Sequence, residues 1–462
     1  MLDQRKNFYK NALSLMLPLI VQNFVTQFMQ LADTFMVGAV GETELAAVTS
    51  ANSLFFVVGL ICFGIQSGAS VLVTQYHGRE NYGAINRVLG MGLYMSVAVT
   101  GVIAIVAFVF PTEIMRLLTN NESLWAPGAD YARIVGFSYI FMSISGTYVA
   151  AQRSMENPKL GAYIFSVSGA LNIVLNYILI FGKLGAPAMG CAGAAVATLI
   201  SRAFEVVVIA FYAPVSKILK LDFSAILHPG KIIIRDFFKY SLPVIMNEGL
   251  WSLAVALYAI ILGHMENSTH ILAAYTLAGN LDKLMSVGLF AAGSAAAVII
   301  GRDVVTKDKD EIRADAMALN KLCFVTGLVG SAVVLLTRAY LCDSVVFPLM
   351  ELSLPAQSVA KYMLLVIACV TPLRAINLCN VVGVFRGGGD VRYALFCDIS
   401  PMYALTVPAA AAAALVIGAP IEIVYVCMCL DDVIKIFLSY PRLKSGKWIN
   451  DITRDEILPQ AN

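Results

Sequence analysis

Apolar segments of twenty or more residues recur along the whole chain, separated by short polar connections. A helix needs about 20 residues to cross the roughly 30 Å hydrocarbon core of a bilayer. The segments are continuous in Leu, Ile, Val, Ala and Phe and lack the alternation of membrane strands. The pattern predicts an all-α integral membrane protein with twelve transmembrane helices, over residues 11–38, 45–75, 86–110, 127–152, 160–182, 188–213, 237–263, 270–301, 315–341, 355–385, 392–417 and 419–440.

The composition supports a membrane location. Hydrophobic residues make up 59% of the 462 positions and charged residues 13%, which is more apolar surface than a soluble core buries. Most Lys and Arg residues fall in the two tails and the even-numbered connections. The positive-inside rule then places both termini in the cytoplasm, with the protein in the cell (inner) membrane. The basic start leads into a span that is too long for a cleavable signal peptide.

The sequence carries no motif of an enzyme or a nucleic-acid-binding protein. The net charge of +2 is explained by the basic loops, so we expect no nucleic-acid partner. The nine cysteines lie mostly inside apolar spans without zinc spacing, and we interpret them as small buried hydrophobes. No nucleotide loop or nucleophile signature marks a catalytic centre. We therefore expect neither an enzyme nor a bound cofactor.

The two halves of the chain repeat each other. LPLIVQN at 17–23 matches LPVIMNE at 242–248, and the same offset of 225 pairs Gly38 with Gly263. Six spans in each half make the repeats parallel, so we expect two six-helix lobes related by a pseudo-two-fold axis along the membrane normal. The expected parts are an N-terminal lobe at 1–215, a cytoplasmic connector at 216–236, a C-terminal lobe at 237–446 and a cytoplasmic tail at 447–462.

Asp33 lies inside the first span, where a carboxylate is costly unless it has partners or a function. A partly desolvated carboxyl can bind a proton, or coordinate Na+ where other oxygens converge. Asn172 and Asn176 are four residues apart on one face of the fifth span, and Thr198 lies in the sixth. These four residues form a candidate cation site. The alternative is a solvated Asp33 near a helix end, with the other three side chains holding helices together.

A second group of charges lies in the other half. Glu248 in the seventh span and Lys283 in the eighth reach a similar depth, which allows them to pair. Arg374 and Asp282 are further members of this group. The group is either a structural neutralisation or a part of ion coupling or substrate binding.

Further acidic residues follow towards the end of the chain. Asp390 comes after three glycines between the tenth and eleventh spans, where it can cap the following helix. Asp398 lies two turns further in and is harder to explain as a cap. Asp431, Asp432 and Lys435, near the end of the last span, are interpreted as an interfacial charge cluster.

Several motifs spread over both halves carry a family resemblance. In chain order they are LADTFMVGAVGETELAAV, GIQSGASVLVTQYHGREN, LNIVLNYILIFGKLGAPAMGCAGAAVATLIS, LPVIMNEGLW and VFRGGGDVRYAL. Together they resemble the multidrug and toxic compound extrusion (MATE) family over nearly the whole chain. The resemblance implies a secondary antiporter that expels drugs or other organic cations while Na+ or H+ flows inward. We expect a monomer in contact with membrane lipid.

The resemblance also implies roles for individual residues. The aspartate of the first helix binds the cation in that family, which corresponds to Asp33, and its companions correspond to Asn172, Asn176 and Thr198. Some members have Asp in place of Asn176, so this chain offers one carboxylate where they offer two, which excludes two-carboxylate schemes.

In another branch of the family, acidic residues on the seventh helix and after the tenth act in the C-terminal lobe. They correspond to Glu248 and Asp390. The C-terminal candidates for coupling or substrate binding are therefore Glu248, Lys283, Asp390 and Asp398.

The alternative function is a lipid-linked precursor flippase of the same broader superfamily. Such a protein needs cations that face its cavity to hold an anionic pyrophosphate, and Lys283 and Arg374 are compatible with that role. The other cations inside spans sit mostly towards helix ends, where they can snorkel to the interface. They are Arg133, Arg202, Lys321, Lys361 and Lys435. We therefore favour an antiporter that works by alternating access.

Overall fold

The protein is built from long helices. The computed structural model describes residues 2–350 and 352–454. Within these ranges, eleven helices are long and apolar enough to cross a membrane. They are α1 (Leu2–Gly38), α2 (Glu42–Gly78), α3 (Tyr82–Val109), α5 (Trp125–Ser154), α6 (Pro158–Phe181), α7 (Gly190–Tyr212), α9 (Gly230–Gly263), α11 (Val287–Thr306), α12 (Lys309–Leu336), α14 (Leu354–Leu378) and α15 (Val391–Pro401), the last three with helical extensions to residues 346, 385 and 417. The predicted all-α membrane fold is confirmed.

Two predicted spans differ from the helices found. The span predicted at 270–301 consists of α10 (Ser268–Met285) and α11, separated by Ser286. Backbone hydrogen bonds continue on both sides, from Ser286 N to Asp282 O (2.8 Å) and from Phe290 N to Ser286 O (3.0 Å), so the interruption is local. The last span corresponds to α17 (Ile421–Ser445), whose 25 residues are long enough to cross but include several charges.

The chain forms two compact units that are not contiguous in sequence. Among the described residues, unit 1 comprises 2–20, 246–350 and 352–452, and unit 2 comprises 21–245 and 453–454. The changes from one unit to the other fall inside α1 and α9, 225 residues apart. Pro18 and Pro243 lie two residues before these positions, inside their helices. Because proline removes a backbone hydrogen bond and disturbs the preceding turn, each helix changes unit close to a built-in weak point.

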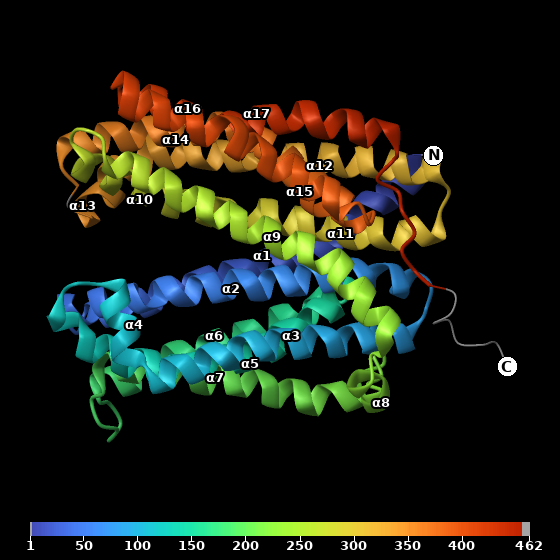
Figure 1. The fold of residues 1–462 in the computed structure, drawn as a ribbon, viewed down its shortest axis with the longest axis horizontal. Helices are drawn as coiled ribbons and strands as arrows, with labels where there is room; N and C mark the ends of the chain where they lie inside the picture. Colours follow the sequence, from blue (N-terminus) through green and yellow to red (C-terminus); the bar gives the residue numbers. More distant parts are fainter. Residues whose placement is uncertain (1, 351, 455–462) are drawn as a thin grey trace. The chain divides into compact units, whose positions relative to one another are not determined.

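Unit 2 is a bundle of α2, α3, α5, α6 and α7, drawn in blue to green in Figure 1. Glycines on α2 allow the first part of α9 to approach closely. A Cβ atom at Gly64 or Gly68 would collide with the backbone of Ile245 or Ser241, respectively. Such backbone-to-backbone packing by small residues is common between membrane helices.

The segment between the two halves folds onto α3. It contains η2 (Ala213–Val215) and the short helix α8 (Phe223–Leu227). Asn86 of α3 holds it, donating from Nδ2 to Lys220 O (3.0 Å) and accepting at Oδ1 from Asp222 N (3.2 Å). The remaining short elements of unit 2 are α4 (Pro111–Leu118) and η1 (Glu122–Leu124).

Unit 1 contains α10, α11, α12, α14, α15 and α17 around two apolar cores. Several of its helices widen into π-helical turns, which arise where prolines or packing interrupt regular hydrogen bonding. Pro401 ends α15 next to one of them. The π-helical segments are η3 (Thr337–Val346), η4 (Cys379–Phe385), η5 (Met402–Thr406) and η6 (Ala412–Ile417), with α13 (Phe347–Leu349) after η3 and α16 (Val407–Ala411) between the last two.

Large apolar side chains are exposed along the spans. Val102 and Ile105 on α3 are each 62% exposed, and Tyr163 on α6 is 72% exposed. A soluble protein rarely exposes apolar residues on this scale, whereas lipid solvates them without cost. Exposed apolar side chains on this scale are typical of helices that contact lipid.

We predict that Gly68→Ala lowers the melting temperature of the purified protein, because the new methyl group collides with the backbone of Ser241. Gly59→Ala is the matched control, since a Cβ at Gly59 of the same helix meets nothing within 4 Å. Fluorescence-detected thermal unfolding in detergent measures both. Equal melting temperatures for the two variants would contradict the close helix contact.

Candidate cation site

Asp33 contacts Asn176 of a neighbouring helix within unit 2. Asp33 lies five residues before the end of α1, and Asn176 lies five residues before the end of α6. Asn176 Nδ2 donates a hydrogen bond to Asp33 Oδ1. The first and fifth spans therefore meet at the two side chains that the sequence singled out.

Further hydrogen bonds extend from Asn176 to α7. Asn176 Nδ2 also donates to Asn172 Oδ1 (3.1 Å), and Asn172 Nδ2 donates to Thr198 Oγ1 (3.4 Å). Both asparagines are fully buried. The spacing of four residues places them on one face of α6, so all four predicted residues lie in one connected cluster.

One oxygen of this cluster is an unused acceptor. Asn176 Oδ1 has no hydrogen-bond partner among the described residues, although Asn176 is 0% exposed. An unpaired buried acceptor costs about 1–3 kcal/mol. Carboxylate, amide and hydroxyl oxygens are the ligands that hard cations prefer, and a carboxylate can instead hold a proton. The arrangement around Asp33 suits one small monovalent cation.

A second buried carboxylate in unit 2, Glu205 of α7, was missed by the sequence analysis. Glu205 is 0% exposed. It accepts hydrogen bonds from Ser145 Oγ (2.7 Å) and Ser168 Oγ (2.8 Å), and it pairs with Arg202 Nη1 (2.7 Å). The cost argument that selected Asp33 applies equally to a glutamate in the sixth span, and its spacing of three from Arg202 was the available signal.

Glu205 changes two interpretations. The place of Arg202 in its span predicts that it snorkels at a helix end, but Arg202 binds a buried carboxylate instead. The exclusion of coupling schemes with two carboxylates assumed that Asp33 is the single acidic residue inside the spans of this half. Glu205 is a second one, so that assumption no longer holds. Ser168 lies one turn before Asn172 on α6, so Glu205 stands close to the Asp33 cluster along the same helices.

In unit 1, Glu248 forms its ion pair with Arg386. The distance from Arg386 Nη2 to Glu248 Oε1 is 2.9 Å. Arg386 follows η4 at the end of the tenth span, and its side chain is 3% exposed. Their similar depth predicts a pair between Glu248 and Lys283. Lys283 is exposed instead, and the carboxylate of its neighbour Asp282 binds Arg374 (2.7 Å). Depth along a helix does not say which face a side chain occupies.

Asp390 does not act as the helix cap that was predicted. It occupies the N-cap position of α15, but its side chain makes no capping hydrogen bond. Its Oδ2 instead binds Arg442 of α17, 2.7 Å from Nη2. A charged partner within reach outcompetes the neutral backbone amides, because an ion pair with hydrogen bonds is the stronger interaction.

The interpretation of Asp431, Asp432 and Lys435 as an interfacial cluster is wrong. These residues are 8%, 5% and 5% exposed, respectively, and lie within α17. Arg374 bridges Asp432 (3.1 Å) and Asp282 (2.7 Å). The charges are thus ion-paired inside unit 1 and are not solvated at an interface.

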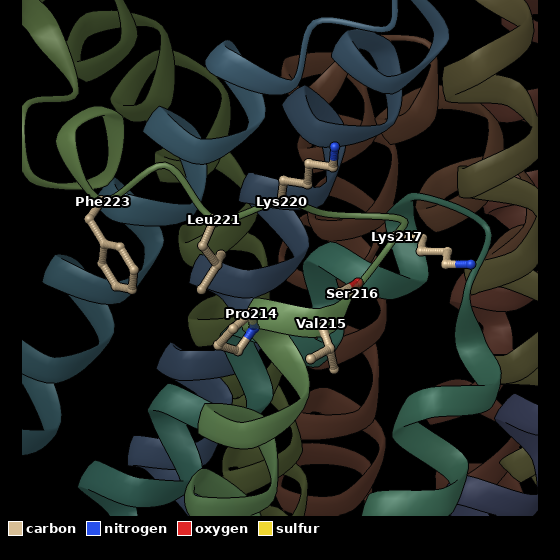
Figure 2. Close-up of a pocket in the computed structure, with 7 residues that line it drawn as sticks. All are labelled: Pro214, Val215, Ser216, Lys217, Lys220, Leu221 and Phe223. Atoms are coloured by element: carbon tan, nitrogen blue, oxygen red, sulfur yellow. The ribbon is translucent and has the colours of Figure 1, made fainter.

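A surface hollow lies on the connecting segment, away from these clusters in sequence. Figure 2 shows its lining residues, which come from η2, from the irregular stretch 216–222 and from the first residue of α8. They are Pro214, Val215, Ser216, Lys217, Lys220, Leu221 and Phe223. None of them belongs to either polar cluster, so the hollow is not part of the candidate site.

The long apolar helices and the polar clusters buried among them define a polytopic membrane transport protein. The family model MatE matches residues 18–178 and 243–412, and the chain belongs to the MATE family of transporters. The two matched segments begin 225 residues apart, at the offset of the sequence repeat. The family resemblance inferred from the motifs is confirmed.

Named relatives and solved structures agree with this family. The chain is 27% identical over 311 residues to "Probable multidrug resistance protein YoeA" of Bacillus subtilis (strain 168), covering 64% of this chain and 65% of the relative. It is 21% identical to "Uncharacterized transporter YisQ" of the same organism, over 94% of each chain. A structure described as the outward-facing conformation of a multidrug resistance MATE family transporter matches with a TM-score of 0.83 and 19% identity, covering 95% of this chain and 96% of that one. That match shows the shared fold.

We predict that Glu205→Ala destabilises the protein by about 3–5 kcal/mol, because it leaves the Arg202 guanidinium buried without its partner. The double variant Arg202→Ala with Glu205→Ala should be less destabilised than the sum of the two single variants. Thermal unfolding of the four proteins in detergent completes the cycle. Additive losses would contradict the pairing.

Proposed function

We propose that the protein is a secondary-active multidrug efflux antiporter, which exchanges organic cations or drugs for Na+ or H+ by alternating access. The observation that supports this function is the hydrogen-bonded cluster of Asp33, Asn172, Asn176 and Thr198, in which both asparagines are buried and Asp33 is half-buried. It offers one negative charge and one unused amide oxygen inside the membrane region. The multidrug names of several relatives support the substrate class.

Coupling follows from the competition for the Asp33 carboxylate. Na+ or a proton bound at Asp33 weakens its hydrogen bond with Asn176, and thereby loosens α1 from α6. The cation and the drug must favour different conformations, because a ligand that binds two states equally shifts nothing. Helix α1 belongs to unit 1 up to Ile20 and to unit 2 from Val21 onward, which is the part that carries Asp33. A change at Asp33 therefore acts on a helix that both units share.

We assign the remaining architecture on the same basis. Residues 1–215 and 237–446 supply the two lobes, except that residues up to 20 belong to compact unit 1 and residues 237–245 to unit 2. Residues 216–236 form the cytoplasmic connector, and both termini face the cytoplasm, as the distribution of basic residues indicates. The part of the predicted tail beyond residue 454 lies outside the described residues. A monomer suffices for this mechanism, because each chain carries both halves.

We predict that Asp33→Asn abolishes drug resistance in a pump-deficient bacterial host, because the amide holds neither a proton nor the charge that attracts Na+. Growth in a series of cationic drugs and efflux of a fluorescent cation measure the effect. Asp343→Asn is the matched control, since Asp343 pairs with Lys361 and its side chain is 58% exposed. The control should keep wild-type efflux.

Expression and melting temperature of the Asp33→Asn protein must match the wild type for the test to count. Wild-type efflux by this variant would refute the proposed coupling role of Asp33. Loss of efflux in Asp343→Asn as well would show that the effect is not specific to the carboxylate at Asp33.

A further inference from the structure

The hollow on the segment that follows α7 combines basic and apolar side chains. Its volume is about 610 Å³. In Figure 2, Lys217 and Lys220 extend to one side of the segment, and Leu221 and Phe223 extend to the other. The hollow therefore offers two ammonium groups and an apolar surface to the same ligand.

The backbone around the hollow is held in place by α3. Asn86 bonds the main chain at two points, because its side chain donates to Lys220 O (3.0 Å) and accepts from Asp222 N (3.2 Å). Four residues further along α3, Gly90 allows the backbone of Ile226 to approach, where a Cβ atom would lie 2.2 Å from Ile226 O. A backbone that is already fixed by its own contacts lowers the cost of ordering the site when a ligand binds.

The charges of the hollow favour an anion. Lys217 and Lys220 are both exposed, and neither has an ion-pair partner in the part of the chain that the structure describes. The one acidic residue in the sequence from 213 to 227 is Asp222. Its Oδ1 accepts hydrogen bonds from Ser224 N (2.9 Å) and Ala225 N (3.1 Å), and so caps α8. Two lysines thus face one carboxylate that is already engaged.

Helix α7 places the hollow at the level of a membrane surface. The helix has 23 residues and ends at Tyr212, directly before the lining residues begin. At 1.5 Å per residue it spans about 34 Å, slightly more than the hydrocarbon core. Phe211 in its last turn is 78% exposed, which is typical of a side chain in contact with lipid. Lipid phosphates lie just beyond the hydrocarbon, so the hollow lies at their depth.

The apolar side of the hollow separates a lipid from a soluble anion. Val215 is 73% exposed and Phe223 is 66% exposed. Inorganic phosphate would pair with the lysines and leave both apolar side chains in water, whereas a phospholipid would cover them with its acyl chains. The cytoplasmic surface, to which the connector is assigned, also carries the negative potential of anionic lipids. Charge, depth and apolar surface together favour an anionic phospholipid.

We propose that this hollow binds one anionic phospholipid, with its phosphate at Lys217 and Lys220 and its acyl chains against Val215 and Phe223. The site lies within unit 2, on the segment that joins the two halves of the sequence. A bound lipid holds this connector at the membrane surface. The proposal does not depend on the antiport function, since no residue of the cluster at Asp33 takes part.

Native mass spectrometry of the purified full-length protein in detergent measures the dissociation constant of each bound lipid. The probes are dioleoylphosphatidylglycerol and, as a zwitterionic reference, dioleoylphosphatidylcholine. We expect the first phosphatidylglycerol to bind about fivefold more weakly to Lys217→Gln and about 25-fold more weakly to Lys217→Gln with Lys220→Gln, because each lysine near an anionic lipid contributes a factor of about five. Phosphatidylcholine should bind these variants as it binds the wild type. The matched control is Lys231→Gln with Arg235→Gln, which removes two exposed basic side chains of α9 that do not line the hollow and should keep the wild-type constant.

A second arm tests the apolar side. Val215→Ser with Phe223→Ser keeps both lysines, and should weaken phosphatidylglycerol roughly tenfold because less apolar surface is covered. Soluble glycerol 3-phosphate at millimolar concentration, which has the phosphate without acyl chains, should not displace the lipid. All replaced side chains are exposed, and melting temperatures equal to that of the wild type establish that each variant is folded.

Two results overturn the proposal. If the lysine variant and its matched control weaken phosphatidylglycerol equally, the attraction belongs to the basic surface as a whole and not to the hollow. If glycerol 3-phosphate displaces the lipid, or the serine variant binds it like the wild type, the hollow is a site for soluble anions. Neither result bears on the proposed coupling role of Asp33, which the efflux measurements test separately.

Discussion

The structure depends on one constraint, which is that the hydrocarbon of a membrane does not solvate charged or polar side chains. Every such group inside a span must be satisfied by another side chain, a backbone group, an ion or a proton. Glu205 meets this requirement with two serines and Arg202. The cluster at Asp33 meets it only in part, because Asn176 Oδ1 has no partner. The difference separates a group that holds helices together from one suited to bind and release a ligand.

The same constraint applies to α1 and α9, the two helices that pass from one compact unit to the other. Both α1 and α9 begin in one compact unit and end in the other, and each has a proline two residues before the change. Four residues after these prolines stand Gln22 and Asn247, at equivalent positions of the repeat, and each has a buried amide oxygen without a partner. The two halves of the repeat therefore share more than the number of their helices. Each half has kept a proline and a polar residue four positions after it, and α1 carries Asp33 while α9 carries Glu248.

Apolar length and the cost of intramembrane charge were sufficient to predict the helical fold and to select Asp33, Asn172, Asn176 and Thr198. Those arguments depend on position along one helix. They could not predict that Glu248 pairs with Arg386, that Asp390 binds Arg442, or that Lys435 is buried, because each depends on which helix faces which. The sequence also could not predict that α1 passes from one compact unit to the other. Pro18 indicates a weak point in the helix, but not which helices pack against it on either side. Glu205 could have been found from the sequence alone.

Transport into proteoliposomes shows whether ion binding at Asp33 drives substrate movement. Purified protein is reconstituted, and uptake of a fluorescent organic cation is followed under an imposed pH gradient, an imposed sodium gradient, or neither. The account predicts that one of the two gradients drives accumulation above the external concentration, and that Asp33→Asn removes this accumulation. Uptake that only equilibrates the dye, with the same time course under all three conditions, would contradict it.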